Sequence, residues 1–339
     1  MKRILVTGAC GYIGSHTLVD LLQEDYDVVS VDSHFNSDDS VLSAIQEITG
    51  KVIKNCFLDL SDEKATRHFF THVGKLDGII HFAALKAVGE SVAKPIEYYK
   101  NNLNSLLNVL EAVQKYQIDA FIFSSSCTVY GQTEVQPVTE DSPFLATGSP
   151  YGRTKQMGES IIQDVFQNLQ TKAISLRYFN PAGAHHSGKL GELPINPPLN
   201  LVPSITETAY GIRSSLQVHG TDYDTKDGSC IRDFIHVEDL ARAHRLALEF
   251  IFSGRQEQAY EVFNIGIGNG VSVLEAISSF ESVSNLKLNK IMGPRRPGDI
   301  PYIYSASQRA RDLLGWTPLY DINDIMQTAW NWEQKRRAT

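Results

Sequence analysis

The sequence predicts an α/β fold, in which a Rossmann-like doubly wound parallel sheet is followed by a smaller mixed α/β domain. Short apolar, β-branched runs alternate with segments of helical periodicity through the first half of the chain, which is typical of repeated βαβ units. The first of these runs ends in a glycine-rich turn, residues 8–14, that leads directly into a helical pattern. The alternation weakens after Asn180, where residues 181–200 are rich in proline and glycine, so a different kind of domain is expected there.

Six strands are expected in the first half, because each is an apolar run bounded by charged or turn-forming residues. They are Arg3–Thr7, Asp27–Asp32, Val52–Phe57, Gly78–Phe82, Ala120–Ser124 and Ala173–Arg177. Between them, apolar residues recur at the i, i+3 and i+4 spacing that predicts helices. These helices are Tyr12–Glu24, Ser40–Thr49, Ser61–Phe70, Pro95–Tyr116 and Pro150–Leu169. We therefore expect a parallel sheet that is covered by helices on both faces.

The second half has shorter and more mixed patterns. After the 181–200 connection, which we expect to face a substrate, the predicted helices are Pro203–Tyr210, Val237–Phe252, Ser272–Ser282, Ser307–Leu314 and Asp321–Lys335. The predicted strands are Leu216–His219 and Glu261–Ile265. Residues 1–180 are thus predicted to form a cofactor-binding domain and residues 181–339 a substrate-binding domain, with residues from about 233 to 265 packing back onto the first.

The glycine turn and the acidic end of the next strand predict an NAD site. Gly8, Gly11 and Gly14 stand where a strand turns into a helix, a geometry that lets backbone N–H groups approach a pyrophosphate. Asp32 ends the following strand, about 20 residues further on, where a carboxylate binds the ribose hydroxyls of the adenosine. A carboxylate at this position also repels a 2′-phosphate, so NAD is favoured over NADP.

Composition and charge exclude several classes of protein. The 339 residues carry a net charge of −8 and no stripe of lysine and arginine, which argues against nucleic acid as a partner. No run of about 18 apolar residues is present, and the chain enters its first strand almost at once, so neither a membrane span nor a signal peptide is expected. His185 and His186 have no acidic or thiol residue at ligand spacing, so no metal site is expected. The scattered cysteines predict free thiols in a reducing cytoplasm; they are Cys10, Cys56, Cys127 and Cys230.

The strongest catalytic signal is the pair Tyr151 and Lys155. They stand four residues apart where a helix is expected to begin, so their side chains share one face. Three serines, residues 124–126, end the preceding strand at the sheet edge where ligands bind. A phenol with an ordinary pKa of about 10 needs about 4 kcal/mol to ionise near neutrality, and one cation about 4 Å away supplies a similar amount at an effective dielectric of about 20. We therefore expect Lys155 to lower the pKa of Tyr151, with help from an oxidised nicotinamide.

Several longer motifs run almost from one end of the chain to the other. They are Gly-Tyr-Ile-Gly-Ser-His (11–16), His-Phe-Ala-Ala-Leu-Lys-Ala-Val-Gly-Glu-Ser (81–91), Tyr-Tyr-Lys-Asn-Asn (98–102), Phe-Ser-Ser-Ser-Cys-Thr-Val-Tyr-Gly (123–131), Leu-Arg-Tyr-Phe-Asn-Pro-Ala-Gly-Ala-His (176–185), Arg-Asp-Phe-Ile-His-Val-Glu-Asp-Leu (232–240) and Arg-Arg-Pro-Gly-Asp (295–299). In these motifs the chain resembles the extended short-chain dehydrogenases/reductases, and among them the UDP-galactose (UDP-glucose) 4-epimerases.

The resemblance implies three groups of site residues. Ser126, Tyr151 and Lys155 would be catalytic. The residues that bind NAD would be Gly8, Gly11, Tyr12, Ile13, Gly14, Asp32, Asn36, Ser37, Asp59, Leu60, Phe82, Ala83, Ala84, Lys86, Asn101 and Phe179. The residues that bind the UDP-sugar would be Asn180, Asn200, Leu201, Gln217, Val218, His219, Arg232, Arg296, Asp299 and Ile303. Two arginines suit a diphosphate, because guanidinium groups match phosphate oxygens.

The implied reaction is NAD-dependent epimerisation at C4 of a UDP-hexose, UDP-glucose or UDP-galactose, through a transient 4-keto intermediate in a cytoplasmic homodimer. Ile303 stands where the family has a small residue or a tyrosine beside the 2-substituent of the sugar, which leaves open an enzyme for UDP-N-acetylglucosamine or for both sugars. His219 stands where an aromatic ring usually stacks on uracil.

Two other functions on the same fold are disfavoured. A nucleotide-sugar 4,6-dehydratase carries an Asp-Glu pair directly after the active-site hydroxyl, as the acid and base for C6. Here those positions are Cys127 and Thr128, which cannot perform that chemistry. A non-catalytic NAD-binding regulator would have lost a catalytic residue, whereas all three are present.

Overall fold

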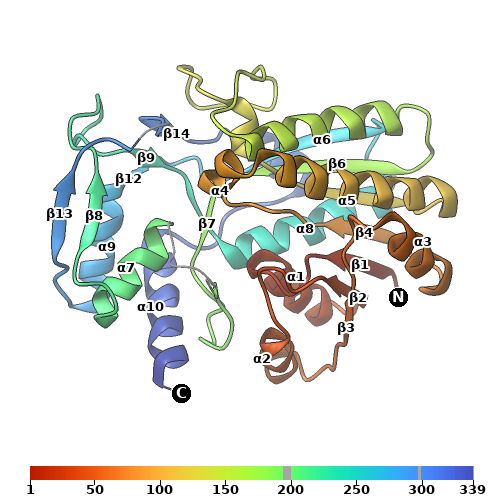
Figure 1. Ribbon diagram of the computed structural model, residues 1–339, viewed down its shortest axis with the longest axis horizontal. Helices are drawn as coiled ribbons and strands as arrows, with labels where there is room; N and C mark the ends of the chain where they lie inside the picture. Colours follow the sequence, from red (N-terminus) through yellow and green to blue (C-terminus); the bar gives the residue numbers. More distant parts are fainter. Residues whose placement is uncertain (194–199, 297–298, 339) are drawn as a thin grey trace.

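The computed structural model describes residues 1–193, 200–296 and 299–338. Within these, seven parallel strands form one sheet in the order β11-β6-β5-β4-β1-β2-β3 (Figure 1). The strands are β1 (Arg3–Thr7), β2 (Asp27–Asp32), β3 (Asn55–Phe57), β4 (Gly78–His81), β5 (Ala120–Ser126), β6 (Lys172–Tyr178) and β11 (Tyr260–Ile265). The prediction of a doubly wound parallel sheet is confirmed.

Helices cover both faces of this sheet, because successive side chains of a strand point to opposite sides. In β1, Ile4 and Val6 pack with α1 (Tyr12–Gln23), α2 (Ser40–Thr49) and α8 (Val237–Phe252) on one face. Leu5 packs with α3 (Glu63–His72), α5 (Pro95–Tyr116) and α6 (Pro150–Phe166) on the other face. Each fully buried side chain of this size contributes about 1.5–3 kcal/mol, so the two cores hold the sheet between them.

A third core lies beside the sheet and joins the elements of the second half. It includes Val218, Ile277 and Trp330, all buried. The helices here are α7 (Leu201–Tyr210), α9 (Val273–Ser284) and α10 (Ile322–Ala338). The short strands are β7 (Asn180–Ala182) with β10 (Phe234–His236), β8 (Leu216–His219) with β13 (Lys290–Gly293), and β9 (Ile231–Arg232) between β12 (Val271–Ser272) and β14 (Tyr302–Ile303). β11 and α8 belong to the second half of the sequence, but they pack on the large sheet.

Several boundaries differ from the sequence-based prediction for local reasons. Helix α3 begins later than predicted, because the Asp62 carboxylate accepts a hydrogen bond from Ala65 N at 3.0 Å and caps the helix there. The predicted helix Ser307–Leu314 is partly a π-helix, over Ala310–Leu314. Helix α4 (Val88–Ala93) and the two-residue strands were not predicted, since so few residues show no periodicity.

Two parts of the predicted organisation lie outside the described residues. They are residues 194–199 of the 181–200 connection and residues 297–298 of the motif 295–299. Within the part that is described, none of the helices has the length and apolar character that a bilayer crossing requires.

Burial of histidine predicts a loss of stability in mild acid. Burial lowers the pKa of five histidines, to about 3 for His81, His185 and His236 and to about 4 for His16 and His244. Unfolded histidine titrates near pH 6.5. As the pH falls below that value, the unfolded chain therefore binds more protons than the folded chain. The free energy of unfolding should therefore drop between pH 7.5 and pH 5.5, by up to about 1.4 kcal/mol per pH unit for each of these groups.

Urea denaturation at the two pH values measures this effect. A chain that is as stable at pH 5.5 as at pH 7.5 would contradict the burial of these five histidines as neutral groups.

Candidate functional site

The predicted cofactor and catalytic residues of the first 180 positions lie at one edge of the large sheet. Each group follows the carboxyl end of a parallel strand, and these ends meet at the edge where open α/β sheets bind ligands. The first residue of each group is Gly8 after β1, Asp32 ending β2, Asp59 after β3, Phe82 after β4, Ser126 ending β5 and Phe179 after β6. The structure therefore brings together side chains that are far apart in the sequence.

The centre of this edge is the topological switch point, where the neighbouring strands β1 and β4 end side by side. The strand order reverses there, since the chain winds from β1 towards β3 on one side and from β4 towards β11 on the other. Gly8 has a left-handed backbone (φ +63°), and a Cβ on it would lie 2.8 Å from Ala83 N. A Cβ on Gly14 would overlap the carbonyl oxygen of Gly8. Gly8 is required by the close approach of the loops after β1 and β4, and Gly14 by the close approach of α1 to the glycine turn itself.

The first turn of α1 supplies donors for an anion. Its N-cap is Gly11, which has no side chain to accept the free N–H groups. The N–H groups of Tyr12 and Ile13 have no partner within the helix and sit at its positive end. Tyr12 is fixed by its own hydroxyl, which donates to Gly183 O at 2.7 Å. The cradle formed by the glycines and this helix end fits a pyrophosphate.

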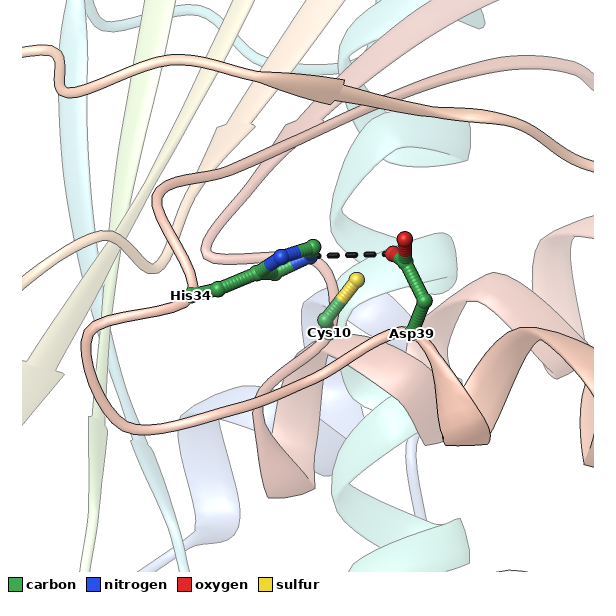
Figure 2. A group of neighbouring side chains, drawn as sticks. All are labelled: Cys10, His34 and Asp39. Atoms are coloured by element: carbon green, nitrogen blue, oxygen red, sulfur yellow. Dashed lines mark ion pairs between the residues drawn. The ribbon is translucent and has the colours of Figure 1, made fainter.

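Asp32 is positioned at the adenosine end of the cradle. Its buried carboxylate accepts hydrogen bonds from Cys10 N (3.0 Å), His34 N (2.8 Å) and the Ser37 hydroxyl (2.8 Å). Cys10, His34 and Asp39 stand beside it, with a 3.0 Å contact between the His34 ring and the Asp39 carboxylate (Figure 2). The carboxylate suits ribose hydroxyls, which are donors, and opposes a phosphate. The predicted neighbour Asn36 is exposed on the same loop.

The loop after β4 is held by a residue that the sequence analysis missed. Asn102 on α5 accepts from Leu85 N at 2.8 Å and donates to Leu85 O at 3.0 Å and to the Thr154 hydroxyl at 3.2 Å. The predicted residue was its neighbour Asn101. Asn102 is a buried amide on an otherwise packed helix face, and a polar residue at a buried helical position is the signal that would have found it.

Ser126, Tyr151 and Lys155 meet across β5 and α6. Helix α6 begins after Ser149, whose hydroxyl accepts from Gly152 N at 3.2 Å, and this start places the tyrosine and lysine one turn apart. Lys155 is 4 % exposed, and its Nζ donates to Ser124 O at 2.6 Å and lies 5.8 Å from the centre of the Tyr151 ring. A hydroxyl, a phenol and an amine thus converge at the sheet edge.

The pKa values of this group differ from the sequence-based expectation. Burial raises the pKa of Tyr151 to about 12, and a hydrogen bond from Ser126 only partly opposes this. Burial also lowers the pKa of Lys155 to about 7, although Glu159 acts in the other direction. The expectation that Lys155 lowers the pKa of Tyr151 is not met, because desolvation weakens the charge of the lysine and its Nζ is directed at Ser124 O.

A buried ion pair behind the site fixes α6 against the sheet. The guanidinium of Arg177 on β6 lies 2.7 Å from the carboxylate of Glu159 on α6 and donates to the Tyr130 hydroxyl at 3.0 Å. Ser125 of β5 also donates to Glu159. Removal of either charge would leave the other buried and unpaired. The sequence analysis missed this network.

The candidate gate residue Ile303 lies next to the catalytic group. It pairs with Arg232 between β14 and β9, and it packs with Cys127 and Phe179 in a small buried cluster. Cys127 directly follows Ser126, and Phe179 directly precedes Asn180, whose N–H donates to Asp233 O at 3.0 Å. The structure therefore places one predicted substrate residue, Ile303, in a buried cluster that includes the neighbour of Ser126, the predicted catalytic serine.

The two predicted arginines share one carboxylate. Arg296 Nη2 donates to Asp299 Oδ1 at 2.8 Å, and Arg232 Nη2 lies 3.7 Å from the same oxygen. Arg232 is also fixed by Ile231 O and Ile300 O, each at 2.8 Å. Two guanidinium groups held side by side in this way suit a diphosphate.

The remaining predicted residues lie along α7 and β8. Asn200 is the N-cap of α7 and donates to Glu192 at 3.4 Å, the carboxylate that also pairs with Lys86. On β8, the side chains of Gln217 and His219 are exposed, whereas Val218 points into the third core. Val218 is buried as a whole residue, so the structure leaves Gln217 and His219 as the two β8 residues that are open to a ligand.

One argument from the sequence is wrong. His185 and His186 do have an acidic neighbour, because Glu238 Oε1 lies 2.8 Å from His186 Nδ1 and 3.4 Å from His185 Nε2. Glu238 is distant in sequence and reaches the pair from the first turn of α8. Residue spacing along the chain could not show this contact.

Known proteins resemble the chain over its whole length. The family described as "NAD dependent epimerase/dehydratase family" matches residues 4–266. A UDP-glucose 4-epimerase of Bacillus subtilis is 44% identical over 331 residues, which are 97% of this chain and 96% of that protein. The crystal structure of UDP-glucose 4-epimerase from Bifidobacterium longum in complex with NAD⁺ and UDP has a TM-score of 0.94 at 43% identity and covers 99% of both chains. A UDP-glucose 4-epimerase from Stenotrophomonas maltophila, with bound NAD and formylated UDP-arabinopyranose, has a TM-score of 0.95 at 40% identity over 100% of both chains.

Proposed function

We propose that this chain, which belongs to the NAD dependent epimerase/dehydratase family, inverts C4 of a UDP-hexose and so interconverts UDP-glucose and UDP-galactose. One observation carries the proposal. The glycine cradle, the Ser126/Tyr151/Lys155 group and Ile303 with Arg232 all meet at the carboxyl edge of the sheet. We assign NAD binding to residues 1–180 with about 233–265, and UDP-sugar binding to the rest of 181–339.

The first part of the mechanism is binding. Gly8 and Gly14 let the backbone approach the pyrophosphate of NAD, and the first turn of α1 donates to it. Asp32 receives the ribose hydroxyls. Arg232 and Arg296 neutralise the diphosphate of the sugar nucleotide. When bound, NAD supplies a hydride acceptor at C4 of the sugar and later returns the hydride.

The second part is proton transfer by Tyr151. The phenolate is the base that takes the proton of the 4-hydroxyl, and the phenol returns it after the ketone has presented its other face. Burial holds the pKa of the phenol at about 12, so ionising it at pH 7 requires about 7 kcal/mol. One cation about 4 Å away supplies only about 4 kcal/mol at an effective dielectric of about 20. Lys155 alone therefore leaves the phenol protonated, and oxidised nicotinamide, when bound, would supply further positive charge.

Two features of the site bear on the alternative reactions. A 4,6-dehydratase needs an acid and a base where this chain has Cys127 and Thr128. Burial raises the pKa of Cys127 to about 12, so this thiol is no base near neutrality. The arrangement of Ser126, Tyr151 and Lys155 is intact, which opposes a purely regulatory role.

Replacing the base tests the mechanism. Tyr151→Phe removes one hydroxyl and keeps the aromatic ring at the start of α6. Turnover of UDP-galactose should fall at least about 10²-fold, as expected for loss of a positioned general base. The dissociation constant of UDP, measured by calorimetry, should change little, because the diphosphate is held by the arginines. Turnover close to that of the unaltered enzyme would mean that another group takes the proton.

The choice between plain and N-acetylated sugars is proposed to depend on Ile303. Its side chain is 5 % exposed and fills the cluster with Cys127 and Phe179 beside the catalytic serine. The acetamido group must fit beside the Ile303 side chain in both orientations of the sugar. We expect UDP-glucose and UDP-galactose to react readily, and UDP-N-acetylglucosamine more slowly or not at all.

Replacing Ile303 by a smaller and by a larger residue tests whether it selects between the two sugars. Ile303→Gly should raise turnover of the N-acetylated sugar relative to the plain sugar, and Ile303→Tyr should abolish it. Product ratios by mass spectrometry, with both substrates offered in parallel, give the answer. If neither change alters the ratio, the gate is elsewhere, and the neighbouring Tyr302 or Tyr304 becomes the candidate.

The protein is further proposed to be a homodimer in the cytoplasm. Apolar side chains are exposed on three neighbouring helices: Val88 and Val92 on α4, Ile96 and Leu107 on α5, and Met157 on α6. A self-complementary face of this kind suits a twofold dimer. Sedimentation velocity should give twice the mass of one chain, and Ile96→Lys with Met157→Lys should halve it. A monomer before substitution would contradict the dimer.

All four cysteines are free thiols, which suits a reducing compartment.

A further inference from the structure

The adenosine end of the site contains three potential metal ligands that the proposed mechanism does not use. Cys10 comes from the loop after β1, and His34 and Asp39 come from the loop after β2. The Cys10 sulfur, the His34 ring nitrogen and an Asp39 oxygen all lie within 4.8 Å of one another. Figure 2 shows the thiol pointing between the histidine ring and the carboxylate. We propose that these three side chains bind a divalent transition-metal ion such as Zn²⁺, and that the bound metal competes with NAD.

The donor set identifies the class of metal. A thiolate, an imidazole and a carboxylate are the ligands of Zn²⁺ in proteins, and three of them with one water give an open tetrahedral site. Mg²⁺ and Ca²⁺ prefer oxygen ligands only and are disfavoured by the sulfur. Cys10 is buried and Asp39 is exposed, so a metal ion would enter from the Asp39 side and meet the thiol last.

The charge around the thiol favours a cation. The Asp39 carboxylate lies beside the thiol, and the Asp32 carboxylate accepts a hydrogen bond from Cys10 N at 3.0 Å. A divalent cation is attracted by these carboxylates, and a thiol gives up its proton when it binds a metal ion.

The contacts of His34 also favour a cation. Its Nε2 lies 3.0 Å from Asn55 Nδ2, a donor, and 3.0 Å from Asp39 Oδ1, an acceptor. One ring nitrogen cannot accept from the amide and donate to the carboxylate at once. The amide of Asn55 cannot be turned around, because its Nδ2 also donates to Asp32 O at 3.2 Å. A bound cation would take the single lone pair of Nε2 together with a lone pair of Asp39, and Asn55 Nδ2 would keep its hydrogen bond to Asp32 O.

The competition with NAD follows from Asp32, and this step rests on the proposed function. Cys10 N, His34 N and the Ser37 hydroxyl all donate to the Asp32 carboxylate, which leaves it 8 % exposed. His34 N and the Ser37 hydroxyl both occupy Asp32 Oδ1, so a ribose hydroxyl gains this oxygen only when these two donors of the 33–39 loop give it up. A metal ion that joins His34 and Asp39 to Cys10 ties this loop to the glycine turn and keeps Asp32 covered.

Co²⁺ is a suitable probe, because a thiolate ligand gives it a strong charge-transfer absorption in the near ultraviolet. The full-length chain is freed of nicotinamide, its fold is checked by circular dichroism, and Co²⁺ is titrated into it. The absorption should saturate at one equivalent and should be displaced by Zn²⁺. Cys10→Ser should abolish it, and Asp39→Asn, a change on the surface, should weaken binding at least about tenfold. Cys56→Ser and His186→Ala are controls for the exposed thiol and for the second histidine cluster, and both should keep the absorption.

The second arm adds the cofactor. NAD should suppress the Co²⁺ absorption, and Zn²⁺ should raise the dissociation constant of NAD in the unaltered chain but not in Cys10→Ser. No absorption, or one that survives Cys10→Ser, would overturn the metal site. An absorption indifferent to bound NAD would overturn the competition. If NAD does not bind at all while the Cys10-dependent absorption remains, the proposed function fails and the metal site stands.

Discussion

The close approach of two loops at the centre of the sheet is the constraint on which the rest of the site depends. At Gly8 the backbone after β1 comes so near Ala83 that no Cβ fits between them. This contact is possible because β1 and β4 are adjacent parallel strands whose carboxyl ends meet at the same edge. It places the N-terminus of α1, the Asp32 carboxylate and Ser126, the proposed catalytic serine, along one edge of the sheet.

Burial, rather than a ready-made charge, sets the chemistry of the proposed catalytic group. It raises the pKa of Tyr151 to about 12, so the phenol is protonated in the protein alone, and it lowers the pKa of Lys155 to about 7, so the amine carries only part of its charge near neutrality. The buried pair of Glu159 and Arg177 and the amide of Asn102 keep α6 against β5 and the loop after β4. Under the proposed function, proton transfer therefore depends on the charge of bound oxidised cofactor, which couples the base to the redox state of the site.

The sequence alone was sufficient to predict those candidate site residues whose roles follow from a local pattern. The turn at Gly8, the acid at Asp32, and the spacing of Tyr151 and Lys155 on one helix face all follow from the order of residues, and the structure places them at one sheet edge. Asn102 and Glu238 were missed because their roles depend on partners far away in the chain. The direction of the Tyr151 pKa was also missed, since desolvation is a property of the packed structure. Two-residue strands such as Ile231–Arg232 leave no periodic signal at all.

The most direct measurement is the amount of NAD bound per chain in Gly8→Ala compared with Gly50→Ala. Both glycines have a left-handed backbone, at φ +63° and φ +71°, so the two substitutions impose a similar backbone strain. A Cβ on Gly50 meets nothing within 4 Å, whereas a Cβ on Gly8 meets the backbone of Ala83. The account predicts that Gly50→Ala keeps its NAD and that Gly8→Ala, still folded by circular dichroism, loses it. Equal NAD content in the two variants would contradict the claim that the cofactor site is built on this close approach.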